Sequence, residues 1–238
     1  RDLSREQLES FFREMGEPAF RGRQVYEWLW QKKAQSFGDM TNVSKVLRQQ
    51  LGERFTLPAL TIDATQYSAD GTIKSRFRTH DGHLVEGVLI PTDERKTACV
   101  SSQIGCSLTC RFCATGYMDR KRNLQFDEIY DEVVLINDQS ERVFGKHLSN
   151  IVFMGMGEPL LNYRNVLRAI ERISSPDGLG MSQRRITVST AGVAKQIRQL
   201  GDDEVRFKLA LSLHAANDAK RNEIMPINDT NNIRELVQ

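Results

Sequence analysis

The sequence predicts an α/β protein, with a series of parallel βαβ units preceded by a smaller α+β N-terminal domain. The second half of the chain alternates strand-length apolar runs with amphipathic helical stretches, which is typical of parallel βαβ units. The first part begins with helical patterns and continues with three strand-like runs separated by turn residues. Because the residues after Pro91 are rich in turn formers, we assign 1–92 to the N-terminal domain and 93–238 to the part built of βα units.

The composition indicates a globular protein with its own hydrophobic core. Of 238 residues, 39% are hydrophobic, and the net charge of +2 permits nucleic-acid binding without arguing for it. No apolar run approaches the roughly eighteen residues that cross a bilayer, and the first residues do not resemble a secretion signal. Three of the four cysteines fall between residues 106 and 113, unlike the paired set of a secreted domain, so we expect a cytoplasmic location.

The N-terminal domain is expected to open with a helical unit over residues 1–55. Ser4 and Gln7 match the capping box of a helix at 4–15, and Gly16 can end it. Apolar spacing predicts two further helices, at 23–34 and 44–51. A three-stranded meander over 60–91 follows, with strands at 61–67, 72–79 and 83–90, because two Asp-Gly pairs favour tight turns between them.

Four βα units are expected after residue 93. The predicted strands are 97–102, 150–154, 185–189 and 206–212, and the predicted helices are 126–139, 163–173, 192–200 and 217–225. The chain starts without Met and ends inside a helix-like stretch at 233–238. We therefore expect it to be truncated, with a barrel that continues in a longer protein.

Cys106, Cys110 and Cys113 form a CxxxCxxC motif in the loop after the first predicted barrel strand. Three thiolates from one short loop can hold three corners of an iron–sulfur cubane and leave the fourth iron open for chemistry. The alternatives are a zinc site completed by His or a fourth Cys, and three buried structural cysteines. No second Cys pair or clustered His completes a zinc pattern, so the spacing favours an iron–sulfur cluster.

Three more motifs follow the other predicted barrel strands. They are Met154-Gly155-Met156-Gly157-Glu158-Pro159, Val188-Ser189-Thr190 and Ser212-Leu213-His214. Ligand sites of parallel βα folds gather at the carboxyl ends of the strands. We therefore expect these motifs and the cysteine loop to form one site.

The segments CSLTCRFCATG, VFMGMGEPLLN, RRITVSTAGV and LSLHAANDAKRNEIMPIN resemble the radical S-adenosylmethionine (SAM) 23S rRNA and tRNA adenine C2-methyltransferases, the RlmN type. FRGRQVYEWLW and EGVLIP match as well, so the resemblance covers nearly the whole chain. It implies a partial (βα) TIM-like radical SAM barrel with a [4Fe–4S] cluster on Cys106, Cys110 and Cys113. SAM would chelate the open iron and be cleaved to a 5′-deoxyadenosyl radical. Such a radical route is needed because adenine C2 is too poor a nucleophile to attack the methyl group of SAM directly.

The same resemblance implies a SAM site. Gly157 and Glu158 are expected to hold the methionine amine of SAM, a cation that suits a carboxylate. The rest of that site is expected to be lined by Ser189, Ser212, Leu213 and His214.

The resemblance also gives roles to two residues that carry little signal by themselves. Glu86 matches the proton acceptor that removes the C2 proton, although by residue type alone it is an exposed strand carboxylate. Cys99 matches a thiol that resolves a covalent protein–RNA adduct by disulfide formation, although alone it is more typical of a small buried hydrophobe.

The chain departs from the family pattern at its C-terminal side. The implied disulfide needs a second cysteine, which is methylated by one SAM and carries the methyl group to the base, and no cysteine follows Cys113. The family barrel has about six βα units, of which four are visible here. We therefore expect a chain that binds a cluster but is inactive in methyl transfer.

The resemblance implies 23S rRNA and tRNA as substrates, residues 1–92 as an RNA-binding accessory domain, an electron donor such as a flavodoxin, and a monomer that does not bind membranes. The sister activity at adenine C8 shares the same motifs and stays open. A non-catalytic, metal-stabilised RNA-binding module is the alternative from another class, although such a module needs no SAM site.

Basic residues offer RNA contacts at three places. Two are short runs near the expected site, Arg120-Lys121-Arg122 after the cysteine loop and Arg184-Arg185 before the third predicted strand. The third combines Arg21, Arg23, Lys32 and Lys33 with Tyr26, Trp28 and Trp30. Helical spacing predicts that Trp28 is buried and that Trp30 is the better contact for a base or a partner. His80, His83 and His147 have no partner at a ligand spacing, so no role is predicted for them.

Overall fold

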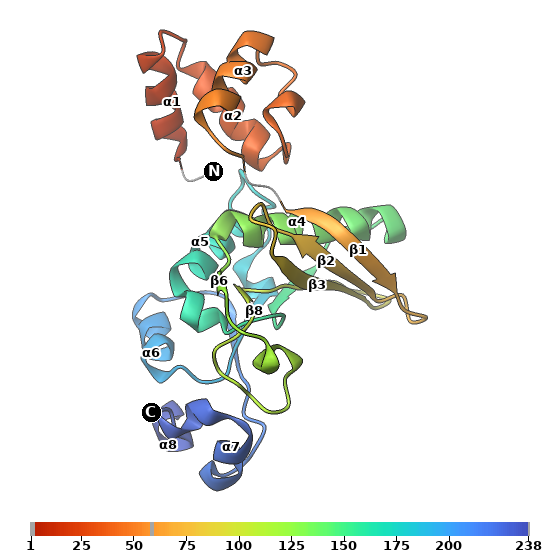
Figure 1. Cartoon of the computed structure of the whole chain (residues 1–238), viewed down its shortest axis with the longest axis vertical. Helices are drawn as coiled ribbons and strands as arrows, with labels where there is room; N and C mark the ends of the chain where they lie inside the picture. The colour runs from red at the N-terminus through yellow and green to blue at the C-terminus, as the bar shows by residue number, and fades with distance from the viewer. Residues whose placement is uncertain (1–2, 58–59, 238) are drawn as a thin grey trace. The chain divides into compact units, whose positions relative to one another are not determined.

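The computed structural model describes residues 3–57 and 60–237, which pack as two compact units. The first consists of Arg1–Ala59 with Arg172–Gly180, and the second of Leu60–Glu171 with Met181–Gln238. Figure 1 shows the helices of the first unit and the sheet of the second. Within the described residues, no helix combines the length and apolar character that crossing a membrane requires.

The first unit contains α1 (Arg5–Glu14), α2 (Phe20–Trp30), a 3-10 turn η1 (Phe37–Asp39) and α3 (Lys45–Arg54). The predicted capping box starts α1, because Ser4 Oγ accepts from the Gln7 amide at 3.2 Å and Gln7 Oε1 accepts from the Ser4 amide at 2.7 Å. Gly16 follows the helix with a φ of +79°. The first predicted helix is therefore confirmed, together with its start and stop signals.

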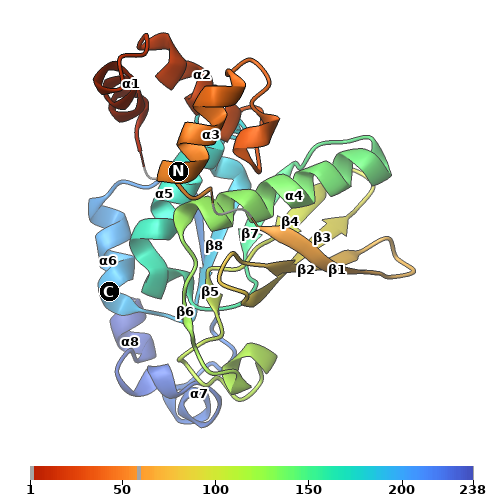
Figure 2. The same ribbon diagram turned by 45° about the horizontal axis from the view of Figure 1, so that its top comes forward.

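The second unit is organised around a seven-stranded sheet in the order β1-β2-β3-β4-β7-β8-β9 (Figure 2). β1 (Thr61–Tyr67), β2 (Ile73–Arg78) and β3 (Leu84–Pro91) form the predicted antiparallel meander. β4 (Lys96–Cys99) pairs antiparallel with β3, and β7 (Asn150–Phe153), β8 (Ile186–Thr190) and β9 (Lys208–Leu211) continue the sheet in parallel. The predicted mixed α/β fold is confirmed.

The predicted domain division at residues 92 and 93 differs from this packing, which divides the chain near residue 60. β3 continues into β4 through a hairpin, in which the Thr92 amide donates to the Arg95 carbonyl at 2.7 Å. Val88 then pairs with Cys99, so the meander extends the barrel sheet. The turn-rich segment after Pro91 is thus a hairpin within one unit, not a linker between two domains. Hairpins and linkers have similar compositions, so the sequence pattern could not distinguish them.

Helices alternate with the parallel strands as predicted. They are α4 (Phe126–Phe144), α5 (Tyr163–Ser174), α6 (Ala194–Asp202) and α7 (Asp218–Ile224). The short elements are β5 (Gln103–Ile104), η2 (Ala114–Tyr117), β6 (Arg122–Asn123), η3 (Pro159–Asn162), η4 (Gln183–Arg185), η5 (Pro226–Asp229) and α8 (Ile233–Leu236).

Helix α4 packs closely on the sheet at β3, as Figure 2 shows. A Cβ at Gly87 would lie 2.6 Å from Glu132 Oε1, so only glycine leaves room for the helix there. The Glu132 carboxyl is fully buried and accepts from the Ser101 amide at 3.1 Å and 3.2 Å. Burial raises the pKa of Glu132, and its contact fixes the chain just before the cysteine loop.

The strand register decides which side chains share a face of the sheet. Cys99 pairs with Val88 on one side and with Val152 on the other. Glu86 lies two residues before Val88 on β3 and therefore shares the face of Cys99. Ser189 shares it too, because it lies two residues after the partner of Val152 on β8. The opposite face carries the buried residues Leu89, Ala98, Ile151 and Val188.

Candidate functional site

A cavity of about 260 Å³ lies at the carboxyl ends of β7, β8 and β9, beside the cysteine loop. All three predicted cluster ligands line it, and so do all but one of the residues predicted to contact SAM. These lining residues are Cys106, Cys110, Cys113, Gly157, Glu158, Ser189, Ser212 and His214. Segments far apart in the sequence thus meet at one site, as the strand-end argument predicts. The exception is Leu213, whose side chain is 41% exposed and does not line the cavity.

The cysteines lie in the loop between β5 and β6, which folds tightly on itself. A Cβ at Gly105 would lie 2.2 Å from the Asp119 carbonyl oxygen, and one at Gly116 would lie 2.6 Å from the Cys110 carbonyl oxygen. The Cys113 amide donates to the Cys110 carbonyl at 3.1 Å. Glycine at both positions therefore lets two limbs of the loop approach each other and gives the cysteines a defined backbone.

Burial raises the pKa of two of the cysteines in this loop, Cys106 and Cys110. It raises the pKa of the Cys110 thiol to about 11, and the neighbouring Cys106, Cys113 and Glu158 act in the same direction. Burial also raises the pKa of Cys106. Because the thiolate is the form that binds metal, loading of this site is coupled to the release of protons. Three soft sulfur donors beside a cavity suit an iron–sulfur core.

Gly157 lies where the segment after β7 crosses β5. Its φ is +92°, and a Cβ there would lie 2.4 Å from Gln103 Cβ. The Gln103 side-chain oxygen also accepts from the Glu158 amide at 2.9 Å. Both the backbone conformation and the close approach therefore require glycine at this edge of the cavity.

Glu158 links two loops of the site. Its carboxylate is 3% exposed and accepts from the Leu160 amide at 2.9 Å and from the Ala191 amide at 2.7 Å. Burial raises the pKa of Glu158, while these two amides and Thr190 act in the opposite direction. The side chain therefore fixes the loop after β8 in addition to lining the cavity.

Polar side chains at the ends of β8 and β9 complete the cavity. The Oγ atoms of Ser189 and Ser212 are 3.1 Å apart. His214 has a φ of +55°, which is uncommon for a residue other than glycine, and its ring centroid lies 4.1 Å from that of Phe112 in the cysteine loop. Hydroxyl and imidazole groups at a glycine-lined cavity suit a polar cofactor.

Glu86 and Cys99 share a face of the sheet, but neither lines the cavity. The Glu86 carboxylate is half exposed and forms an ion pair with Lys74 Nζ at 2.8 Å. Burial and the charge of Glu132 raise the pKa of the Cys99 thiol to about 11, so Cys99 is protonated at neutral pH. All four cysteines are free thiols, and the disulfide implied for Cys99 is not formed in this chain.

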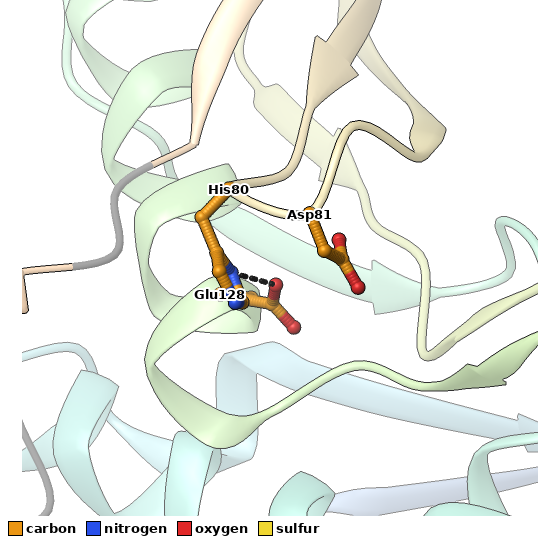
Figure 3. A group of neighbouring side chains, drawn as sticks. All are labelled: His80, Asp81 and Glu128. Carbon is orange, nitrogen blue, oxygen red and sulfur yellow. Dashed lines mark ion pairs between the residues drawn. The ribbon is translucent and has the colours of Figure 1, made fainter.

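The sequence patterns missed a cluster formed by His80, Asp81 and Glu128 (Figure 3). His80 Nδ1 lies 3.7 Å from Glu128 Oε1. Arg122 donates to both Asp81 oxygens, at 2.7 Å and 2.9 Å, and to both Glu128 oxygens, at 2.7 Å. These carboxylates raise the pKa of Arg122. By residue type alone the cluster resembles a cation site, but the guanidinium of Arg122 already neutralises its two carboxylates.

Arg122 is thus engaged inside the fold, contrary to the expectation that it contacts phosphate. Arg122 and Asp81 are separated by 41 residues. No local spacing in the sequence could have revealed this pair.

The two tryptophans of α2 have the reverse of their predicted roles. Trp30 is 1% exposed, whereas Trp28 is partly exposed and donates its indole N–H to Asn42 Oδ1 at 2.5 Å. Lys32 Nζ lies 4.4 Å from the centroid of the Trp28 ring. The prediction was wrong because the buried stripe of α2 includes Trp30 together with Val25, Tyr26 and Leu29.

Two protein-family models match the chain, one in its N-terminal part and one in the remainder. Residues 1–57 match the ribosomal RNA large subunit methyltransferase N-terminal domain, and residues 100–238 match the radical SAM superfamily. Over 236 residues, the chain is 62% identical to a probable dual-specificity RNA methyltransferase RlmN of Cytophaga hutchinsonii and 57% identical to one of Christiangramia forsetii. These alignments cover 99% of this chain and 65% and 67% of the two relatives.

A solved structure gives the same result. The crystal structure of a radical SAM methyltransferase from Sphaerobacter thermophilus matches with a TM-score of 0.90 and 40% identity, over 99% of this chain and 69% of that one. The fold and the cysteine loop thus define the class as radical SAM proteins, which implies SAM and an iron–sulfur cluster as cofactors. Within that class, the chain belongs to the RlmN-type family of RNA methyltransferases. It spans about two thirds of the length of the curated relatives that it matches.

Proposed function

We propose that the protein is a radical SAM enzyme that methylates C2 of adenosine in 23S rRNA and tRNA. The observation that carries this proposal is the cavity where Cys106, Cys110 and Cys113 meet the motifs of three strand ends. The similarity to dual-specificity RNA methyltransferases over 99% of the chain supports the same function. An RNA-binding module without catalysis would have no use for such a cavity.

The three cysteines would hold a [4Fe–4S] cluster, with SAM bound beside it. Three soft sulfur donors from one short loop, all lining the same cavity, fit this group. When bound, the cluster and SAM supply a 5′-deoxyadenosyl radical, which adenine C2 needs because it is a poor nucleophile.

The residues around the cysteines would bind and orient SAM. Glu158 keeps a carboxylate fixed by two backbone amides, where it can attract the methionine ammonium group. Gly157 lets the backbone of the same segment approach the cofactor. Ser189, Ser212 and His214 would face the polar parts of SAM, and Leu213 would contribute through the backbone between the last two.

Glu86 would accept the proton from C2, and Cys99 would resolve the covalent adduct with RNA. Both occupy the same face of the sheet, and the ion pair with Lys74 orients the Glu86 carboxylate. Burial raises the pKa of the Cys99 thiol to about 11, so a base must take its proton before it attacks the sulfur of the second cysteine, whose thiol carried the methyl group. The new sulfur–sulfur bond would form as the bond from that sulfur to the carbon on the base breaks, and the electron pair of the broken bond would leave with the base. That second thiol, the methyl carrier, is not among the 238 residues of the chain.

The partners follow from this activity. We infer that the substrates are 23S rRNA and tRNA, that an electron donor such as a flavodoxin reduces the cluster, and that the enzyme works as a cytoplasmic monomer. In the first unit, Trp28 and Lys32 form a partly exposed pair that suits an RNA base and phosphate.

Mass spectrometry of nucleosides tests the proposal. The complete gene that encodes the chain would be expressed in bacteria lacking their own C2-methyltransferase, with Cys106→Ala as the control. We expect 2-methyladenosine in 23S rRNA and tRNA from the wild type and none from the control. A product methylated at C8 would instead assign the sister activity. Unmodified RNA, together with one zinc per purified chain, would assign the RNA-binding module.

A further inference from the structure

Arg221 in α7 is a fully buried cation at the edge of the cofactor site, with 0% of its surface exposed. Nε donates to the Leu213 carbonyl at 3.2 Å, and Nη2 donates to the Ala191 carbonyl. The further acceptors are the Ser212 carbonyl at 3.5 Å, the Asn231 carbonyl at 3.4 Å and Asn228 Oδ1. Every one of these acceptors is neutral.

The charge of Arg221 lacks a direct counter-ion in the part of the chain that the structure describes. No carboxylate oxygen there lies within 4.0 Å of the guanidinium. Burial lowers the pKa of Arg221, while Asp218 and Cys110 act on it in the opposite direction from farther away. Because a buried charge without a partner is costly, its presence points to a negative group that the fold is built to hold.

Arg221 lies close to the cysteine loop. Cys110 packs against Ala191 and Met225 in one buried cluster, and the Ala191 carbonyl accepts from Arg221. A single residue, Ala191, thus connects a predicted cluster ligand to the guanidinium. Its amide donates to Glu158, so the same turn is held at its carbonyl by a cation and at its amide by a carboxylate.

We propose that Arg221 is a positioning residue for the cofactor site: it anchors the strand ends of β8 and β9 and supplies a buried positive charge that stabilises an anionic cluster behind Cys110. This inference rests on the proposed function. Three thiolates around a [4Fe–4S]²⁺ core carry a net charge of −1, and one-electron reduction by an external donor makes it −2. A nearby cation favours the reduced state and therefore raises the reduction potential.

The anchoring part of the proposal concerns SAM. The carbonyls of Ala191, Ser212 and Leu213 all accept from one planar guanidinium, which fixes the loops that bring Ser212 and His214 to the cavity. Lysine keeps the charge but loses the fork of donors, whereas glutamine loses the charge and keeps one amide donor group. The two substitutions therefore separate the two effects.

The test measures the reduction potential of the reconstituted cluster by an EPR-monitored titration, and the affinity for SAM by equilibrium binding. It compares the wild type with Arg221→Gln, Arg221→Lys and Lys220→Gln. Lys220 is the matched control, because it is the exposed neighbour of Arg221 on the same helix. We expect a more negative potential in Arg221→Gln alone. We expect SAM binding to be about tenfold weaker in both Arg221 variants, with Lys220→Gln like the wild type in both measurements.

Equal reduction potentials in Arg221→Gln and Lys220→Gln would contradict the proposed effect of the Arg221 charge on the cluster. A SAM affinity equal to that of the wild type in Arg221→Lys would contradict the proposed anchoring of the strand ends. The SAM affinity of Arg221→Lys tests the anchoring even if the Arg221→Gln protein does not fold. A wild-type protein that assembles no cluster would overturn the proposed function and this inference with it. Intact clusters with unchanged potential and SAM affinity would overturn this inference alone.

Discussion

Single residues set the shape of the cavity at the ends of β7, β8 and β9, and Gly157 shows this most directly. Its φ is +92°, and a Cβ at this position would lie only 2.4 Å from Gln103 Cβ, which leaves no room for a side chain. Glu158, the next residue, is held by backbone amides on two loops. A small displacement at Gly157 is therefore transmitted to the residues that line the cavity.

We predict that Gly157→Ala weakens SAM binding to the reconstituted protein by about tenfold or more, because the segment must move away from Gln103. Gly201→Ala is the matched control, since a Cβ at Gly201 meets nothing within 4 Å and the residue belongs to α6. Equilibrium binding of SAM measures both variants. Equal affinity in the two would contradict the role assigned to the Gly157 backbone.

Cys99 gives a prediction of pH dependence. Only the thiolate reacts with iodoacetamide, and burial raises the pKa of this thiol from 9.0 to about 11. Below pH 9, alkylation of Cys99 should therefore be about a hundredfold slower than that of a peptide spanning residues 97–101, and its rate should rise until pH 11. Peptide mapping by mass spectrometry measures the rate, and a profile that levels off near pH 9 would refute the assignment.

Among the elements, helices α1 and α2 depend on a close backbone contact within the first unit. A Cβ at Gly22 in α2 would lie 2.5 Å from the Glu9 amide nitrogen of α1. Gly52 in α3 is different, because its nearest neighbour is a side-chain atom of Phe37 at 3.9 Å. The two helical glycines therefore respond in opposite ways to the same substitution.

Gly22→Ala should destabilise the protein by about 1–3 kcal/mol, since the helices must separate. Gly52→Ala should stabilise it by about 0.5–1 kcal/mol, because alanine is the better helix former. Thermal unfolding followed by circular dichroism compares the two variants with the wild type. A stabilising Gly22→Ala would show that the two helices are not packed as described.

The elements also show what sequence patterns can predict. The strand predicted at 61–67 coincides with β1, because turn residues and apolar alternation mark both of its ends. The strand predicted at 97–102 ends earlier, at Cys99, since the amides of Ser102 and Gln103 turn to the Met156 carbonyl instead. β5 and β6, of two residues each, were missed because they exist only through pairing across the cysteine loop.

Some residues of the candidate site could likewise be predicted from the sequence, and others could not. The motifs at the ends of β7, β8 and β9 and the cysteine loop could be found from spacing and strand-end placement, and the structure brings them together. Arg122 and Arg221 could not be placed, because their partners lie up to 41 residues away in the sequence. Contacts between residues distant in the sequence depend on the completed fold and leave no periodic signal.

For the molecule as a whole, every residue that lines the cavity beside the cysteine loop belongs to the second unit. The first unit matches a separate N-terminal domain of ribosomal RNA methyltransferases. Chemistry and RNA contact are thus expected from different parts of the chain. The central claim is that three cysteines hold a cluster whose remaining iron is open to SAM.

Mössbauer spectroscopy of the protein reconstituted anaerobically with ⁵⁷Fe tests that claim most directly. We predict a [4Fe–4S] cluster in which one iron of four changes its signal when SAM is added, and no cluster after substitution of Cys106, Cys110 or Cys113 by alanine. A spectrum that SAM leaves unchanged, or a protein that takes up one zinc in place of iron, would contradict the account.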